Sequence, residues 1–271
     1  MKSRELVRRH PVLAYFILAF TISWVGCLLA AGPKFIRGET MGHADALLVF
    51  LTVLLVPSLS GVALTAFLDR RSGLRDLCSR ILEARVGAAW YATLLVFPIL
   101  IAVVIVALRL LVSEDFALGF ELLGMPIGLM AGFFEEIGWT GFALPRMLGK
   151  RSALLVAVVL GLLQTSWHVV ADFLTTSGSR GGYWMPHFAA FFISMIAMRV
   201  FVVWVYANTR SLLLGQLVHT NSIGFLAVLV PLSLSPAQDT LFYVVYSVTL
   251  RSAVAIVVTV FGKNLVRAHA G

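Results

Sequence analysis

Two adjacent glutamates, Glu135 and Glu136, lie in the apolar and small-residue stretch GLMAGFFEEIGWTGFALPRM. Neighbouring residues of a helix point about 100° apart, so both carboxylates can border one cavity, but they cannot do the same job there. A carboxylate held in such a place suits a general base that takes a proton from water. The alternative is a structural pair that is solvated or hydrogen-bonded by neighbouring helices.

Two histidines stand alone in other apolar segments, His168 in GLLQTSWHVV and His219 in LLLGQLVHTNSIGF. Two imidazoles and one carboxylate can hold a zinc ion with water in the fourth position, which makes Glu135, His168 and His219 candidate zinc ligands. The second glutamate would then take the proton from that water. The same four residues can instead activate water without a metal, with the histidines stabilising the oxyanion. The sequence leaves both versions open.

Other catalytic signatures are absent from the sequence, which contains no HExxH, GxSxG, phosphate-binding glycine loop or CxxC. Ser166 and Ser194 lie in apolar segments, but nothing marks either as a nucleophile. Arg199 and Arg251 are further ionisable residues in such segments. We expect the side chain of Arg199 to reach the cytosolic surface. Arg251 falls nearer the middle of its segment, which favours a functional role.

The composition places these residues in a membrane. Of 271 residues, 60% are hydrophobic and 13% are charged, whereas soluble domains are about 45–50% apolar and about 25% charged. A helix needs about 20 apolar residues to cross the hydrocarbon core. We predict an all-α polytopic bundle in which residues 1–271 form a single membrane domain. The eight predicted spans are about 12–31, 46–68, 88–111, 122–144, 152–174, 187–207, 211–230 and 240–261.

The net charge of +8 reflects the topology of the chain. Most basic residues fall in one set of loops and at both termini, namely Lys2, Arg4, Arg8, Arg9, Arg70, Arg71, Arg75, Arg80, Arg85, Arg146, Lys150, Arg151, Arg210, Lys263 and Arg267. The positive-inside bias therefore places both termini in the cytosol. This distribution favours contact with anionic lipid head groups and argues against nucleic acid as a partner. We expect a multi-pass integral protein of the bacterial cytoplasmic membrane.

One loop on the basic side has helical periodicity. Residues 69–87 read DRRSGLRDLCSRILEARVG, and Leu74, Leu77, Ile81 and Leu82 fall on one side of a helix, opposite most of the arginines. This pattern is typical of an amphipathic helix that lies on the membrane surface. We therefore predict a cytosolic amphipathic helix over residues 69–87.

The segment EEIGWTGFALPRM resembles the first motif of the CAAX prenyl protease 2 and bacteriocin-processing family of intramembrane endopeptidases, also called the CPBP or ABI family. His168, in a Trp-His context, and His219 stand where that family has its second and third motifs, so the resemblance covers about residues 120–225. It implies an eight-helix endopeptidase with a cavity open toward the cytosol. It also implies that the glutamate pair activates water, with Glu135 as the base, while the histidines position water or stabilise the oxyanion.

The first motif departs from the family pattern at Thr140, which stands where the family has arginine. This position lies one helical turn after Glu136, so an expected ion pair is missing. Arg146, Arg199 or Arg251 would have to supply the charge from elsewhere.

The other two motifs also depart from the pattern. Gln164 replaces a phenylalanine one turn before His168, where its amide can hydrogen-bond the imidazole or a substrate backbone. In the third motif Ile223 stands where asparagine is common, and Ser222 lies on the helical face nearer to His219. We regard Thr140, Gln164, Ser222 and Arg251 as candidates for contact with substrate or for support of the catalytic residues.

Three hypotheses follow for function. The first is an intramembrane endopeptidase that acts on a membrane protein or a lipidated peptide in the bilayer. Thr140 motivates the second, a catalytically inactive relative that binds membrane peptides as a scaffold or an immunity protein. The third is a transporter that uses Glu135, Glu136 and Arg251, although no internal repeat supports it. The oligomeric state is not indicated by the sequence.

Overall fold

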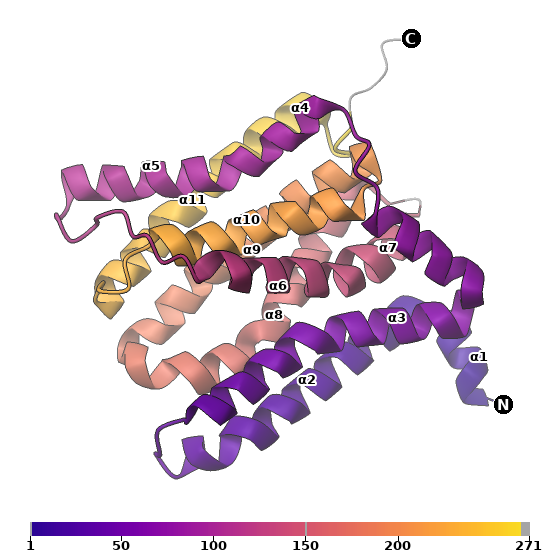
Figure 1. Ribbon diagram of the computed structural model, residues 1–271, viewed down its shortest axis with the longest axis horizontal. Coiled ribbons are helices and arrows are strands. Elements are labelled where there is room, and N and C mark those ends of the chain that lie inside the picture. The colour runs from indigo at the N-terminus through magenta and orange to yellow at the C-terminus, as the bar shows by residue number, and fades with distance from the viewer. Residues whose placement is uncertain (1, 150, 267–271) are drawn as a thin grey trace.

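The protein is a bundle of helices, and the computed structural model describes residues 2–149 and 151–266 (Figure 1). No strand occurs within these residues, so the predicted all-α membrane fold is confirmed. The elements are α1 (Lys2–Arg9), α2 (Pro11–Ile36), α3 (His43–Ile81), α4 (Ala88–Tyr91), η1 (Ala92–Leu95), α5 (Val96–Leu111), α6 (Gly124–Glu136), η2 (Ile137–Ala143), α7 (Leu144–Leu148), α8 (Ala153–Arg180), η3 (Gly181–Tyr183), α9 (Trp184–Thr209), α10 (Leu212–Leu229) and α11 (Pro236–Phe261). Lys150 and Arg267, two of the predicted cytosolic basic residues, lie outside the described residues.

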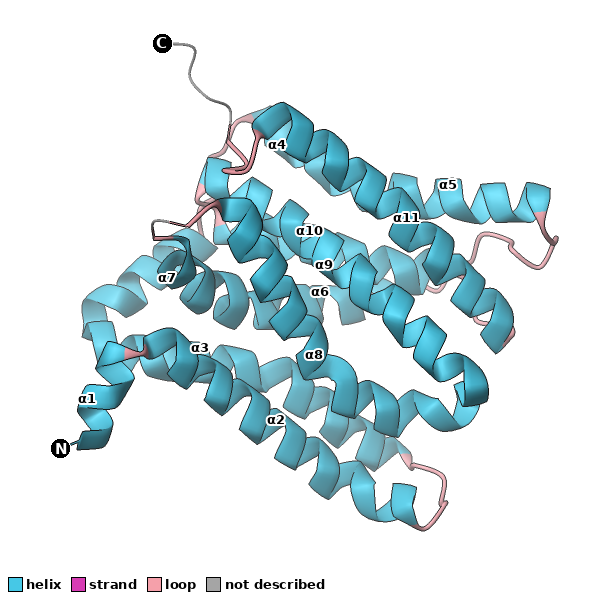
Figure 2. Cartoon of the chain, turned by 180° about the vertical axis from the view of Figure 1, so that it is seen from behind, coloured by secondary structure: helices cyan, strands magenta, loops and turns pink. Residues whose placement is uncertain are grey.

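Helices occupy all eight predicted spans. Among the described residues, 6 helical stretches are long and apolar enough to cross a membrane. One of these, Ala153–Thr209, consists of two helices, because the chain turns back at Gly181, where φ is +52°. As a result α8 and α9 run side by side in opposite directions (Figure 2). The predicted span 122–144 is built differently, since it is divided into α6, the π-helix η2 and the short α7.

The loops, turns and chain ends lie at two opposite ends of the bundle (Figure 1). Helix α1 and the C-terminal end of α11 lie at one end (Figure 1). The loops that join α2 to α3, α5 to α6, and α10 to α11 lie at the other, together with the turn between α8 and α9. This arrangement agrees with an even number of crossings, as the distribution of basic residues predicts.

Helix α3 bends sharply near its C-terminal end, at Arg70, whose φ of 55° and ψ of −144° are not helical (Figure 1). The helical segment beyond this bend ends at Ile81, so the prediction of a helix that continues to residue 87 is wrong. Leu77 is buried against Ile137 and Leu212, but Leu82, which follows the last helical residue, is 77% exposed. Only part of the predicted apolar face is therefore helical and buried, and that part packs against other helices of the bundle.

An aromatic cluster fills the core where α2 and α8 meet η2. The ring of Trp139 lies 5.5 Å from that of Tyr15 and 5.5 Å from that of Trp167, measured between centroids, and both pairs are edge to face. Phe16 and Phe142 complete the cluster, and all five side chains are buried. Such rings contribute both apolar area and preferred edge-to-face geometry. They fix the segment that directly follows the two glutamates.

A stripe of glycines brings α6 against α10. Gly124, Gly128 and Gly132 recur at every fourth residue, and Glu136 is the next residue of the same series. A Cβ atom at Gly128 would lie 2.5 Å from the Cα of Gly224, and one at Gly132 would lie 2.5 Å from the backbone nitrogen of Thr220. Residues four apart share one face of a helix. The close approach of the two backbones therefore also carries Glu136 against α10.

Candidate active site

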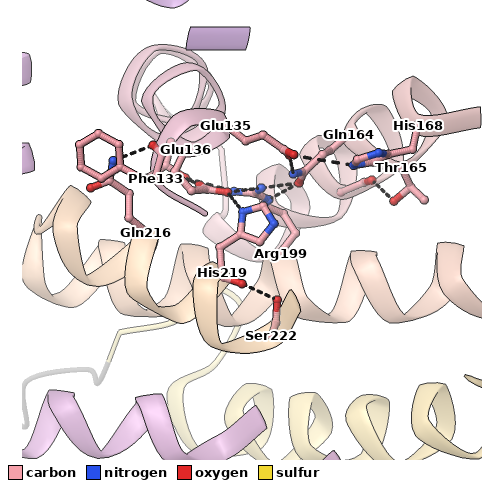
Figure 3. A network of polar contacts seen from close by, with 12 residues as sticks. Phe133, Glu135, Glu136, Gln164, Thr165, His168, Arg199, Gln216, His219 and Ser222 are labelled. Carbon is pink, nitrogen blue, oxygen red and sulfur yellow. Dashed lines mark hydrogen bonds and ion pairs between the residues drawn. The ribbon is translucent and has the colours of Figure 1, made fainter. Parts of the chain in front are cut away.

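Polar side chains from four helices meet in the interior of the bundle (Figure 3). Glu135 and Glu136 end α6, Gln164 comes from α8, Arg199 from α9 and His219 from α10. Each of these residues is at most 3% exposed. Because burial of such groups is costly unless they are paired, their contacts decide what the cluster can do.

Glu136 uses both of its carboxylate oxygens in contacts with other side chains. Arg199 donates to it twice, from Nη1 to Oε2 and from Nη2 to Oε1, each at 2.7 Å. Oε1 also lies 2.7 Å from Nδ1 of His219, and Oε2 accepts a hydrogen bond from the Thr140 hydroxyl. A paired arginine fork of this kind is among the strongest contacts a carboxylate makes. Glu136 is thus held in place and cannot accept a further proton without losing a partner.

Arg199 is fully buried, so the prediction that its side chain reaches the cytosolic surface is wrong. Besides its two bonds to Glu136, it donates from Nε to Oε1 of Gln164 at 2.9 Å. A guanidinium in this position has its charge balanced by a carboxylate rather than by water. The missing ion pair of the first motif is therefore made by an arginine from another helix.

Gln164 links the two glutamates. Its Oε1 accepts from Arg199, and its Nε2 donates to Oε2 of Glu135 at 3.1 Å. The sequence predicts that its amide bonds the imidazole of His168 or a substrate, and the structure shows this different arrangement. Both ends of the amide are satisfied inside the cluster, as a buried amide requires.

Glu135 is the less occupied carboxylate of the pair. Within the described residues, its side chain accepts one hydrogen bond, from Gln164, and Oε2 lies 4.0 Å from Nε2 of His168. This separation is too long for a direct hydrogen bond but suits one water molecule at about 2.8 Å from each atom. The His168 side chain is 17% exposed, so the cluster is accessible from outside the protein at this histidine.

Two imidazole nitrogens near these carboxylates have no partner in the described part of the chain. They are Nε2 of His168 and Nε2 of His219, and both atoms are buried. Because Nδ1 of His219 faces the Glu136 carboxylate, the tautomer with the proton on Nδ1 is favoured and Nε2 carries a lone pair. A buried nitrogen left in this state is a site for water or for a substrate group.

The predicted zinc ligands do not fit a metal as they are arranged. Ligand atoms around tetrahedral zinc are about 3.4 Å apart, given bonds of about 2.1 Å, whereas Glu135 and His168 are separated by 4.0 Å. Among residues 2–149 and 151–266, no group of three His, Cys, Asp or Glu side chains is placed to hold a metal ion.

Two predicted site residues lie apart from the cluster. Arg251 is on an exposed face of α11, and its Nε donates to the backbone oxygen of Ser247 at 3.4 Å. Ser222 is buried, but its hydroxyl donates to the backbone oxygen of His219 at 2.9 Å rather than to a catalytic group. The functional role expected of Arg251 is therefore not supported, and neither is a transport pathway that includes it.

We expect Arg251→Gln to change neither the folding nor the activity of the protein. The side chain is exposed and its Nε bonds the backbone of its own helix, and substitutions at such positions usually change the free energy of unfolding by less than about 0.5 kcal/mol. Thermal unfolding in detergent, compared with the wild-type protein, measures the effect. A clear loss of stability would show that Arg251 has a partner in the membrane that the fold does not reveal.

The structure also shows supporting residues that the sequence did not indicate. Gln216 donates to the backbone oxygen of Phe133 at 2.8 Å, and the hydroxyl of Ser58 donates to that of Phe134. Both acceptors lie just before η2, where the change from α to π geometry shifts the backbone donors by one residue. Gln216 from α10 and Ser58 from α3 donate hydrogen bonds to these two backbone oxygens. Their positions in apolar spans were the only available signal.

The fold and the cluster together define a polytopic helical membrane protein with a buried carboxylate, arginine and histidine site. Residues 117–222, which include every member of the cluster, match the model of the type II CAAX prenyl endopeptidase Rce1-like family. A stretch of 96 residues is 26% identical to CAAX prenyl protease 2 of Methanococcus maripaludis. It covers 34% of this chain and 35% of the relative, so the chain matches about a third of that protein's length.

These two matches support assignment of the chain to the CAAX prenyl protease 2 and bacteriocin-processing family, as its motifs predict.

Proposed function

We propose that the protein is an intramembrane endopeptidase in which Glu135 activates the attacking water. The observation that carries this proposal is the unequal occupation of the two carboxylates. Glu136 is saturated by Arg199, His219 and Thr140, whereas Glu135 accepts a single hydrogen bond among the described residues and lies 4.0 Å from His168. A base must be within reach of the proton that it takes, either directly or through one water molecule.

We propose a role in hydrolysis for each residue from this geometry. A water between Glu135 and His168 attacks the peptide carbonyl carbon, and its proton passes to Oε2 of Glu135. His168, whose Nε2 has no hydrogen-bond partner in the described chain, keeps its proton and donates a hydrogen bond from Nε2–H to the developing oxyanion. The lone pair on Nε2 of His219 accepts a hydrogen bond from the water and orients it. When the carbon–nitrogen bond breaks, Glu135 returns the proton to the leaving amine.

The substrate class follows from the setting of the site and from the relative. The cluster lies inside a helical membrane bundle, so the peptide bond has to be delivered from within or beside the bilayer. The name of the relative, CAAX prenyl protease 2, indicates a prenylated substrate for that protein. We propose a membrane protein or a lipidated peptide as the substrate of this chain.

Cleavage by the purified protein tests the proposal. The protein is reconstituted in liposomes with a panel of single-pass membrane peptides and prenylated peptides, and the products are identified by mass spectrometry. We expect hydrolysis of at least one peptide, and we expect it to continue in excess chelator, because the cluster does not fit zinc. Ser166→Ala and Ser194→Ala serve as controls that exclude a serine nucleophile. Inactivation by chelator with recovery on addition of zinc would overturn the metal-free mechanism.

The closed state of the cluster favours a second candidate function. Glu136 and His219 are 0% exposed and Glu135 is 3% exposed, so a peptide bond has no direct access to them in this conformation. An inactive relative that binds membrane peptides as a scaffold or an immunity protein would retain such a cluster for its structural role. Binding of a peptide from the panel without hydrolysis of any would support this function and contradict the protease.

A further inference from the structure

We propose that Arg199 takes, from α9, the place of the arginine that the first motif lacks at Thr140, and that it positions both glutamates for their separate roles. This inference rests on the proposed function, because it assigns a positioning residue to the same site. It concerns a residue outside all three motifs, on a helix to which the motifs give no role.

The first support is the space that the guanidinium occupies. Nη1 of Arg199 lies 3.1 Å from Oγ1 of Thr140 and 2.7 Å from Oε2 of Glu136. An arginine at position 140 would be one turn from Glu136 and would place its own guanidinium in the same space. Thr140 is short enough to leave that space free, and it is 0% exposed. The two positions therefore serve a single guanidinium site.

The second support is the contacts that reach both glutamates from Arg199. In one direction, Arg199 holds Glu136, which in turn faces Nδ1 of His219. In the other direction, Arg199 donates to Gln164, whose amide nitrogen donates to Glu135. One guanidinium thus fixes the tautomer of the histidine and the orientation of the proposed base.

The third support is that the same arrangement accounts for a second departure from the family pattern. Gln164 stands where the motif has phenylalanine. Its Oε1 accepts the Nε–H of Arg199, a donor that phenylalanine would leave unpaired in a fully buried place. Thr140, Gln164 and Arg199 therefore form one connected arrangement, in which the positive charge enters the cluster from α9.

Relocating the arginine tests the inference. Four purified proteins are compared in liposomes with a peptide that the wild type cleaves, namely the wild type, Arg199→Ala, Thr140→Arg and the double variant with both changes. We expect Arg199→Ala to lower kcat/KM at least about 100-fold, because it leaves the buried Glu136 carboxylate without its partner. Thr140→Arg alone is also expected to lose activity, because two guanidinium groups compete for one site.

The double variant is expected to recover at least about tenfold in kcat/KM over Arg199→Ala, because one arginine again faces Glu136. The losses should appear mainly in kcat, with KM changed by less than about threefold, since Arg199 positions the catalytic residues without contacting substrate. Because misfolded protein would also lower the apparent kcat at unchanged KM, kcat is expressed per mole of folded protein, as determined by size-exclusion chromatography and circular dichroism. Arg251→Ala is the control for removal of an arginine from a membrane span.

Thermal unfolding of the same four proteins separates the inference from the proposed function. If the wild type cleaves no peptide, the protease proposal fails, and the unfolding temperatures alone decide the role of Arg199. The inference then predicts that Arg199→Ala lowers the unfolding temperature and that adding Thr140→Arg raises it again. Wild-type behaviour of Arg199→Ala, or a double variant no better than Arg199→Ala in both measurements, would overturn the inference.

Discussion

Glu135→Gln is expected to lower the rate of peptide hydrolysis about 1,000-fold while the protein stays folded. A positioned general base contributes about 100-fold to 10,000-fold, and glutamine cannot take the proton from water. Glutamine nevertheless keeps an oxygen that can accept the hydrogen bond from Gln164, so the packing of the cluster is preserved. The measurement is kcat at saturating peptide in liposomes, together with the unfolding temperature in detergent.

A matched control for this substitution is Glu121→Gln. Glu121 is an exposed carboxylate in the loop before α6, so the same chemical change is made away from the cluster. We expect the control to retain wild-type turnover. Retention of more than about a tenth of the wild-type kcat by Glu135→Gln would assign the proton to another group, for which His219 is a candidate because its Nε2 has no hydrogen-bond partner in the described chain.

Gly128→Ala and Gly132→Ala are each expected to reduce the free energy of unfolding by about 2–3 kcal/mol, the cost of overpacking a close contact. The added Cβ of Gly128 would lie 2.5 Å from Gly224 Cα, and that of Gly132 would lie 2.6 Å from the backbone oxygen of Gln216. Since the obstructing atoms belong to the backbone, α6 and α10 have to move apart. This movement separates Glu136 from His219, whose contact is 2.7 Å, so peptide hydrolysis should fall as well.

Gly178→Ala provides the comparison for these two variants. Gly178 lies in α8, and a Cβ at this position would have no atom within 4 Å. Alanine is a better helix former than glycine by roughly 0.5–1 kcal/mol, so this variant should unfold at the same or a higher temperature than the wild type. Equal stability of all three alanine variants in detergent would show that the close packing of α6 and α10 is not required for the fold.

The all-α bundle was predictable because a chain in lipid must satisfy its backbone hydrogen bonds within helices, so apolar length alone marks the spans. The proximity of Glu135 and His168 was predictable in part, because an ionisable group in a span is too costly to be kept without a use, and the role proposed for them stays a prediction. The contact between Glu136 and α10 was not predictable in the same way. It depends on a backbone approach that the glycine series permits but does not specify.

For the two intramembrane arginines, depth along the helix does not predict whether the side chain is buried or exposed. Arg199 has a side chain long enough to reach the surface from its position, yet it turns inward and is fully buried. Arg251 lies nearer the middle of its span, yet it is on an exposed face. The deciding quantity is the rotation of each helix about its axis, which is set by packing against neighbours. The sequence of a single span does not contain that information.

Local backbone changes were also beyond the sequence. Arg70 interrupts α3 with a positive φ, and the helix beyond it ends at Ile81, although the apolar periodicity continues to Leu82. The π-helix η2 begins directly after the glutamate pair, in a segment with the composition of an ordinary apolar helix. Neither interruption is marked by proline, so local preference alone does not predict where the regular α-helix stops.

The position of Arg199 on α9 couples it to Thr140, although the two residues are 59 positions apart in the sequence. Loss of Arg199 alone leaves the buried Glu136 without an arginine, and Thr140→Arg alone gives it two. We therefore expect an arginine at position 140 to be tolerated only when the one on α9 is removed. A search pattern that demands arginine in the first motif would discard this chain, even though its cluster keeps a guanidinium beside Glu136.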